Sequence, residues 1–335
     1  MVDFARALEA AGADAGFGYL SIGPAGPDSL DYVPYLIEAI LNTESVFGTV
    51  ITADRQWGVS LLAVAAAAGA IIELGRLWDQ GFGNLPFAAL ANCPPDIPFF
   101  PAGYHQSGQS SCGIAWEAAD LAVDAFSIAG TIAEAQQRLR TLVEREGKRV
   151  VRVTRELAER CGITFTGIDL SLAPYPEEAR SISVAFERLG VDVFVASGTL
   201  FVAALLTGVL QQARLPKTGY SGLMLPVLED PVLAKRAAQG TYTINDLLLY
   251  SAVCGLGLDV VPLPGDTSID TLRGLLLDVA TLAARLDKPL SARLMPLPGK
   301  QAGDPTGFSF PYFASATVMP VKDYGTARLY ARDGL

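Results

Sequence analysis

The chain has 335 residues, of which half are hydrophobic and 18% are charged. Its 25 Lys and Arg are outnumbered by 35 Asp and Glu, which gives a net charge of −10. No basic run and no patch of mixed basic and aromatic residues is present, which argues against nucleic acid as a partner. A chain of this length can form one large domain or two ordinary ones. Since no clean linker interrupts it, we expect a single domain over residues 1–335.

The four cysteines and the amino terminus indicate the compartment. Cys93, Cys112, Cys161 and Cys254 are scattered without a C-x-x-C pair, which argues against a disulfide framework and against a zinc or iron–sulfur site. The first residues lack the charged and apolar regions of a signal peptide. We therefore expect a cytoplasmic protein.

The longest uncharged run, residues 56–72, is Ala-rich and shorter than the roughly 18 apolar residues that a membrane span needs. It is better explained as a helix that lies in the core or in a dimer interface, so we expect no membrane contact. Together with the high apolar fraction, this helix predicts a homodimer or a higher homo-oligomer.

Strands and helices alternate in the first third of the chain, which is the pattern of an α/β protein. Helices are predicted over Val2–Ala11, Val33–Leu41 and the Ala-rich run to Trp78, and strands over Gly16–Ile22, Phe47–Thr52 and Phe87–Ala91.

A Pro-, Gly- and Ser-rich loop, Cys93–Cys112, follows and contains His105, the single histidine of the chain. A loop of this length inside a compact domain is usually functional or disordered, so His105 is as much a candidate site residue as an ordinary solvated one. A helix is predicted over Gly113–Phe126, where Glu117 is the carboxylate to watch because it lies near the loop.

The middle of the chain continues the alternation and holds two buried-looking carboxylates. Asp169 lies inside an apolar strand, where a charge is costly unless it is paired or metal-bound. Asp230 is explained as the N-cap of a helix that starts at Pro231, whereas Glu229 has no such role. Ser197 and Thr199 precede a helix and serve either as a cap or as an anion cradle. Helices are predicted over Thr131–Cys161, Ser181–Leu189, Leu200–Gln212 and Tyr242–Ala252, and strands over Ile163–Leu172, Val191–Val195 and Gly219–Val227.

Residues 251–304 organise the rest of the chain. Gly257–Leu263 reads as a buried parallel strand with one charge, Asp259, and ends in the loop Pro-Gly-Asp-Thr. A helix then begins with Thr267 and Asp270 in a capping box. Ser291–Leu297 is the next strand and ends in Pro-Gly-Lys, followed by Gly-Asp.

Ligand groups gather at the carboxyl ends of strands in α/β folds, and two neighbouring strands here end in similar polar loops. Ordinary turn chemistry explains these loops about as well. In the site interpretation, Asp259, Asp266, Asp304 and His105 are catalytic. The residues expected to bind substrate are Lys300, Glu229, Asp169, Ser197, Thr199, Gly265 and Thr267.

Several carboxylates that converge on one site repel one another and need a cation, a shared proton or a basic partner. Lys300 is one such partner; Mg²⁺ or Ca²⁺, which prefer oxygen ligands, are others, and the cofactor stays open. We expect Asp259 to face the interior within hydrogen-bonding or metal-bridged reach of another polar residue of this set, with Lys300, Asp266 and His105 as the favoured partners.

Several motifs of this chain resemble those of a family of uncharacterised proteins, the domain-of-unknown-function family 711 (UPF0210). The similarity covers roughly residues 90–320. The motifs, in order, are FFPAGYH (99–105), GIDLSLAPYP (167–176), SGTL (197–200), GYSGLMLPVLED (219–230), VCGLGLDVVPLPGDT (253–267), KPLSARLMPLPGK (288–300) and AGD (302–304).

The resemblance implies an α/β fold similar to the ten-stranded barrel of the glycyl radical enzymes (pyruvate formate-lyase-like). Members of the family usually begin about a hundred residues earlier, so the chain is expected to lack an amino-terminal portion. The carboxyl-terminal GFSFPYFASATVMPV contains no glycine-radical loop, so no glycyl radical is expected. Thiol chemistry at Cys254 is suggested only by the barrel and is disfavoured.

Two functions stay open. The first is an enzyme that acts on a small polar or anionic metabolite, of the hydrolase, lyase or isomerase type, with or without a divalent cation. The second is a protein that binds or senses a metabolite without transforming it. In both, the partner is a small molecule.

Overall fold

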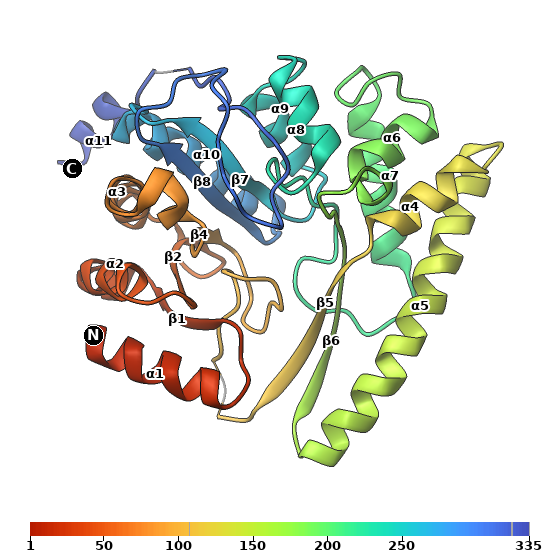
Figure 1. Cartoon of the computed structure of the whole chain (residues 1–335), viewed down its shortest axis with the longest axis horizontal. Coiled ribbons are helices and arrows are strands. Elements are labelled where there is room, and N and C mark those ends of the chain that lie inside the picture. Colours follow the sequence, from red (N-terminus) through yellow and green to blue (C-terminus); the bar gives the residue numbers. More distant parts are fainter. Residues whose placement is uncertain (107, 323, 335) are drawn as a thin grey trace.

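A computed structural model of the chain describes residues 1–106, 108–322 and 324–334. Helices and strands alternate over most of its length (Figure 1). In chain order the elements are α1 (Val2–Asp14), β1 (Leu20–Ala25), η1 (Pro27–Tyr32), α2 (Val33–Leu41), β2 (Val46–Asp54), β3 (Gly58–Val59), α3 (Leu61–Leu77), η2 (Asp79–Asn84), β4 (Phe87–Ala91), β5 (Ser111–Glu117), α4 (Ala119–Ser127), α5 (Ile132–Cys161), β6 (Thr164–Ala173), η3 (Glu178–Arg180), α6 (Ile182–Leu189), α7 (Thr199–Gln212), α8 (Pro231–Ala238), α9 (Ile244–Ser251), β7 (Gly257–Pro264), α10 (Ile269–Leu286), β8 (Leu290–Leu297) and α11 (Ala327–Arg332).

The main sheet has the strand order β1-β2-β4-β8-β7, with the short β3 antiparallel to β2. Strands β1, β2 and β4 are parallel to one another, β7 and β8 are parallel to each other, and the two groups meet in the antiparallel pair β4–β8. The α/β class and the largely parallel sheet are thus as expected. The strands from the amino-terminal and carboxyl-terminal parts of the chain form one sheet.

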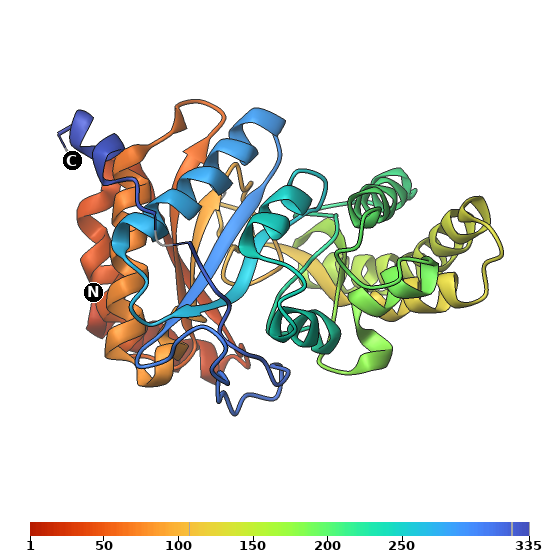
Figure 2. The same ribbon diagram turned by 90° about the horizontal axis from the view of Figure 1, so that it is seen from above.

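Helices cover one face of this sheet. Figure 2 shows α1, α2 and α3 in red and orange, and α10 in light blue, on the same side of the strands. The Ala-rich helix α3 buries Ala63, Ala67 and Ala68 completely within the chain. Its apolar character therefore has an intramolecular explanation, although the predicted oligomer remains a prediction.

Strands β5 and β6 form a separate parallel pair that runs beside the long helix α5 (Figure 1). The predicted helix over Gly113–Phe126 is wrong in its first half, because Ser111–Glu117 is strand β5 and only Ala119–Ser127 is helical. Hydrogen bonding to β6 outweighs the weak helical signal of this short run, as tertiary context often does. The correction places Glu117 at the end of a strand.

Two predicted strands are not strands. Residues 191–195 form bends and turns, and Gly219–Val227 is irregular; two isolated bridges, Ile168–Lys217 and Pro226–Asp259, pair residues 217 and 226 with strands. These bridges link β6 to one end of the 217–226 segment and β7 to the other. Among the described residues there are eight strands and no closed barrel, so the implied ten-stranded barrel is not found.

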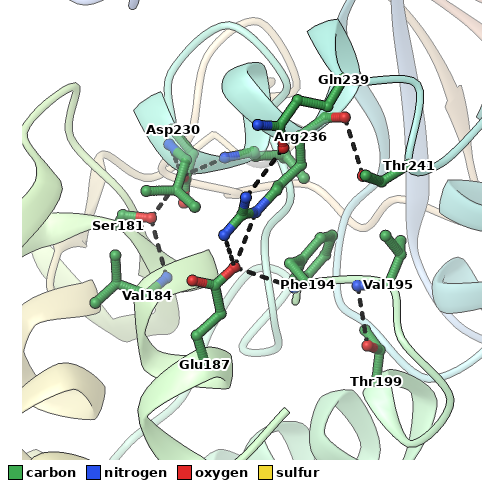
Figure 3. Close-up of polar contacts among 12 residues, drawn as sticks. Ser181, Val184, Glu187, Phe194, Val195, Thr199, Asp230, Arg236, Gln239 and Thr241 are labelled. Carbon is green, nitrogen blue, oxygen red and sulfur yellow. Dashed lines mark hydrogen bonds and ion pairs between the residues drawn. The ribbon is translucent and has the colours of Figure 1, made fainter. Parts of the chain in front are cut away.

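Asp230 joins two helices. It caps α8 by accepting hydrogen bonds from the Val232 and Leu233 amides at 3.0 and 2.9 Å, as predicted. The Ser181 hydroxyl also donates to it at 2.6 Å, from the start of α6 (Figure 3). Helix α10 begins one residue later than expected, because Ser268 rather than Thr267 is its N-cap.

Within the described ranges, no helix is long and apolar enough to cross a membrane. The core is one large apolar cluster shared by the helices and the sheet, with two smaller clusters on the opposite face of the sheet.

Candidate active site

A cavity of about 340 Å³ opens on the face of the main sheet that the helices leave uncovered. Most of its wall is apolar, and a small group of ionisable residues lies within it. The lining residues are Tyr19, Phe47, Leu85, Ala88, Phe99, Phe100, Pro101, Ala102, Glu117, Ala173, Pro174, Tyr220, Met224, Glu229, Leu256, Asp259, Ser291, Arg293, Phe310 and Tyr312. A concave, largely apolar site with a few convergent polar groups is the usual form of a small-molecule site.

Arg293 is the centre of the charged group. Its Nε and Nη2 donate to the two carboxylate oxygens of Asp259 at 2.6 and 3.0 Å, and Nη2 also donates to Glu229 at 3.1 Å. The Arg293 and Asp259 side chains are each only 10% exposed. The two paired hydrogen bonds compensate the desolvation cost of burying both charges. A buried charge without a partner would have no such compensation.

The electrostatics separate the roles of the carboxylates. Burial raises the pKa of Glu229 to about 7, although 26% of its side chain reaches solvent. The Asp259 and Glu117 charges add to this rise, and Arg293 opposes it. Burial alone would lower the pKa of Arg293, but the two neighbouring carboxylates raise it above its usual value. Arg293 is therefore a fixed cation, whereas Glu229 can exchange a proton near neutral pH.

The alternation of β8 explains why Arg293 reaches the cavity. Leu290, Ala292 and Leu294 pack into the helix-covered core, so Ser291 and Arg293 point to the other face. A charge in an otherwise apolar strand is the signal that could have identified Arg293.

Strand β7 holds Asp259 next to an irregularity. The pairing with β8 shifts register between Leu258 and Val261, and Val260 has a φ of 40°. Positive φ in a β-branched residue costs of order 1–3 kcal/mol and tends to occur at functional sites. The bulge breaks the period-two alternation of a regular strand at Val260, next to the Asp259 carboxylate that contacts Arg293.

Two atoms of this group have no hydrogen-bond partner among the described residues: Nη1 of Arg293 and the second carboxylate oxygen of Glu229. Both belong to side chains that line the cavity. A guanidinium donor and a carboxyl group of near-neutral pKa thus remain available to a ligand.

Tyr220 adds a buried hydroxyl to the wall. It donates to the Ser291 hydroxyl at 3.0 Å, and burial raises its pKa well above 10, so it remains protonated. The Cys93 sulfur lies 3.8 Å from the Tyr220 hydroxyl, but burial raises the pKa of the Cys93 thiol to about 12. Because the thiolate is the nucleophilic form, Cys93 is inert at neutral pH.

Asp169 positions Tyr220 rather than lining the cavity. It is fully buried and accepts hydrogen bonds from the Tyr220 and Ser221 amides at 2.7 and 2.9 Å and from Ser171. A Cβ atom on Gly219 would lie only 2.1 Å from its carboxylate, at a φ of 64°, so glycine is required there. Burial raises the pKa of Asp169, which these hydrogen bonds oppose.

The two polar loops predicted to form one site do lie together, but they do not line the cavity. The Gly265 amide donates to the Lys300 carbonyl at 3.0 Å, and Gln301 bridges Asp266 and Asp304 at 3.2 and 2.8 Å. Lys300 donates its ammonium to the Pro305 carbonyl at 2.9 Å. The partner of Asp259 is therefore Arg293, and the expectation of Lys300, Asp266 or His105 was wrong.

The other predicted residues are spread over the molecule. His105 is exposed, 3.4 Å from Asp96, and Ser197 is exposed before α7. Thr267 donates to the Pro264 carbonyl at 2.6 Å, inside its own turn. The Thr199 hydroxyl accepts from the Val195 amide and donates to the Ala196 carbonyl, which holds the turn before α7 (Figure 3). Cys254 is buried in the main core and lies outside the cavity lining.

No three His, Cys, Asp or Glu side chains in the described part of the chain lie close enough together to hold a metal ion. Arg293 occupies the position between Asp259 and Glu229 and supplies the compensating positive charge.

The comparisons with known proteins agree with the motif resemblance and extend it to the amino terminus. The family model described as "Uncharacterised ACR (DUF711)" matches residues 1–309. A UPF0210 protein of Pyrobaculum arsenaticum is 32% identical over 95% of this chain and 72% of its own length. Those of Methanopyrus kandleri and Desulforudis audaxviator are 31% and 32% identical, over 100% and 98% of this chain and 76% of each relative. The chain belongs to the DUF711 (UPF0210) family.

Proposed function

We propose that the cavity is the active site of an enzyme that transfers protons on a small metabolite with a carbonyl or hydroxyl oxygen, as an isomerase or lyase does. The observation that carries this proposal is the Glu229–Arg293–Asp259 group at an aromatic wall. Such a group pairs a proton-exchanging carboxyl with a cation that cannot lose its proton.

The chemistry divides between two side chains. Nη1 of Arg293 would donate to the substrate oxygen, where negative charge develops when a proton leaves the adjacent carbon. Glu229 would take that proton and return it to a neighbouring atom, or a leaving group would depart instead. Asp259 would hold the guanidinium in place and keep it charged. The aromatic wall would exclude water and strengthen each electrostatic contact.

The range of substrates is narrower than the sequence indicated. Lys300, the expected binder of an anionic group, lies outside the cavity lining, and Arg293 is already matched by two carboxylates. A neutral or cationic substrate therefore suits the cavity better than an anionic one. Divalent-cation assistance has less support than direct acid–base catalysis, because the Arg293 guanidinium already lies between Asp259 and Glu229.

The test uses exchange with solvent. The protein is incubated in D₂O with a panel of small hydroxy and carbonyl compounds, and NMR follows the loss of carbon-bound protons and any conversion. Glu229→Gln should reduce the exchange rate by about 100-fold or more, the usual contribution of a general acid–base group. Glu38→Gln, which changes an exposed carboxylate on α2, is the matched control.

Exchange that survives Glu229→Gln would contradict the proposed role. A compound that binds but is recovered unchanged and unexchanged would favour the alternative, a protein that binds or senses a metabolite without transforming it.

A further inference from the structure

The cavity carries an excess of negative charge. Its acidic and basic lining residues are three carboxylates, Glu117, Glu229 and Asp259, and one cation, Arg293. Asp259 and Glu229 share that cation, whereas Glu117 accepts no hydrogen bond from any described residue. The Glu117 charge is close enough to contribute to the raised pKa of Glu229, so both carboxylates act on the same space.

The cation whose charge lowers the pKa of Glu117, Arg180, contacts other side chains. Arg180 interacts electrostatically with Glu117, but its guanidinium lies 3.6 Å from the Glu177 carboxylate and 5.2 Å from the centre of the Tyr175 ring. Arg180 is not among the residues that line the cavity. Glu117 is thus an exposed carboxylate at the rim, without a basic partner inside the cavity.

Two clusters of aromatic rings contribute to the wall of the same cavity. In the first cluster, the ring centres of Phe310 and Tyr312 lie 5.3 Å apart, and Tyr312 packs edge-on against Tyr175. In the second cluster, Phe100 packs against Phe47 and Tyr19. Tyr312 remains 46% exposed and Phe100 38% exposed, although each belongs to a ring cluster. Proteins bind organic ammonium groups with aromatic rings and with carboxylates, and this cavity is lined by both.

We propose that the cavity binds a small organic ammonium compound with an apolar body, and that Glu117 and the aromatic rings of the wall hold the charged nitrogen. A second contact rests on the proposed function: the oxygen of the same molecule reaches Arg293 and Glu229. A metal ion is a poorer occupant, because the described residues offer no cluster of three ligands. An anion is poorer still, because it would add to the excess negative charge.

The test compares three probes with the same aromatic body and different charge: benzylamine, benzyl alcohol and benzoate. Dissociation constants are measured at pH 7 by titration calorimetry or ligand-observed NMR. Benzylamine should bind about tenfold tighter than benzyl alcohol, which corresponds to about 1.4 kcal/mol, and benzoate should bind most weakly. Raising the salt concentration should reduce this advantage.

Two variants locate the charge that matters. Glu117→Gln should reduce the preference for benzylamine over benzyl alcohol at least threefold, while Glu38→Gln on α2 leaves it unchanged. Equal affinities for the three probes, the reverse order, or a preference that Glu117→Gln does not alter would overturn the inference.

The Glu229→Gln variant separates this inference from the proposed function. It should retain the preference for benzylamine within about threefold, because Glu117 is intact, even though proton exchange is lost. A preference for the amine without any proton exchange in the wild type would sustain the ammonium site and reject the catalytic role. Proton exchange without a preference for the amine would do the opposite.

Discussion

The Asp259–Arg293 pair resembles one surface pair in its shortest distance and differs from it in burial. Arg55 and Asp287 also make a short contact, at 2.5 Å, but their side chains are 64% and 70% exposed. Solvent screens a surface pair, so that it contributes little to stability. A buried pair is different, because loss of one partner leaves the other charge in a low-dielectric site.

Asp259→Asn should therefore lower the free energy of unfolding by about 3 kcal/mol. Asp287→Asn is the matched control and should change it by less than about 1 kcal/mol, since asparagine also tolerates the φ of 49° at that position. Urea denaturation at pH 7 measures both. Equal losses of unfolding free energy in the two variants would show that the buried pair contributes no more to stability than the surface pair.

Glu229 should make stability depend on pH in a defined direction. Its pKa is raised in the fold from 4.5 to about 7, so between these values the folded state holds more protons than the unfolded state. The contribution of Glu229 to stability is then largest below about pH 4.5, falls as the pH rises to about 7, and is constant above.

Glu229→Gln removes this titration. The unfolding free energy of the wild type relative to Glu229→Gln should fall by up to about 3 kcal/mol between pH 4.5 and 7. Denaturation curves at several pH values in this window measure the difference. A difference that is flat, or that rises with pH, would refute the raised pKa.

At the scale of elements, a close backbone contact fixes the segment that lines the cavity. A Cβ atom on Gly222 would lie 2.6 Å from the Gly255 Cα, and one on Gly255 would lie 2.7 Å from the Gly222 Cα. The irregular segment that carries Tyr220 and Met224 therefore packs directly against the turn before β7. Neither glycine has a positive φ, so the constraint is steric.

Gly222→Ala and Gly255→Ala should each destabilise the protein by about 2 kcal/mol, because backbone cannot move aside as a side chain does. Gly69→Ala is the control, since no atom lies within 4 Å of its added Cβ and the residue is within helix α3. It should be neutral or stabilising by up to about 1 kcal/mol. Thermal denaturation compares the three; a tolerated alanine at both 222 and 255 would contradict the close contact.

The Asp230 junction between α6 and α8 is the other element-scale constraint. Four donors from two helix starts converge on this one buried carboxylate. Nearby, Arg236 on α8 donates to Glu187 on α6 at 2.7 Å, so polar contacts join the two helices twice (Figure 3).

Asp230→Ala should cost about 3 kcal/mol, because it orphans buried donors as well as removing a cap. Thr131→Ala removes the exposed cap of α5 and should cost about 1 kcal/mol. If urea denaturation gave both variants the same loss, the Asp230 carboxylate would be no more than an ordinary cap.

At the scale of the whole molecule, the cavity draws on distant parts of the chain. Glu117 ends β5, Glu229 precedes α8, Asp259 and Arg293 come from β7 and β8, and Tyr312 lies in the carboxyl-terminal segment. The main sheet itself joins strands from both ends of the sequence. The site therefore exists only when the complete fold has formed.

The predicted homo-oligomer belongs to this scale. Large apolar side chains remain exposed near the amino terminus, among them Phe4 at 60% and Phe17 at 65%. Burial of such residues between two copies would account for the apolar composition. Light scattering at micromolar concentration should give the mass of a dimer or larger assembly, and a monomeric mass would contradict it.

Local patterns in the sequence determined the α/β class and most elements, because helix periodicity, helix caps and apolar strands each depend on residues that are close together in the sequence. Phe87–Ala91 and Val33–Leu41 were predicted with the bounds that the structure has. Asp259 and Glu229 stood out as carboxylates that need an explanation. Their partner could not be inferred, since a buried charge requires a counter-charge but the sequence does not say which residue supplies it.

Tertiary structure alone decided which polar residues meet. Arg293 reaches Asp259 through the pairing of β7 with β8 and a bulge at Val260, both of which depend on long-range register. The strand at Ser111–Glu117 forms because β6 offers hydrogen bonds to a segment of weak local preference. The polar loops after β7 and β8 meet as expected, but neither loop lines the cavity. The carboxylates that do line it, Glu117, Glu229 and Asp259, come from within or beside strands, and their positions depend on how distant strands pair.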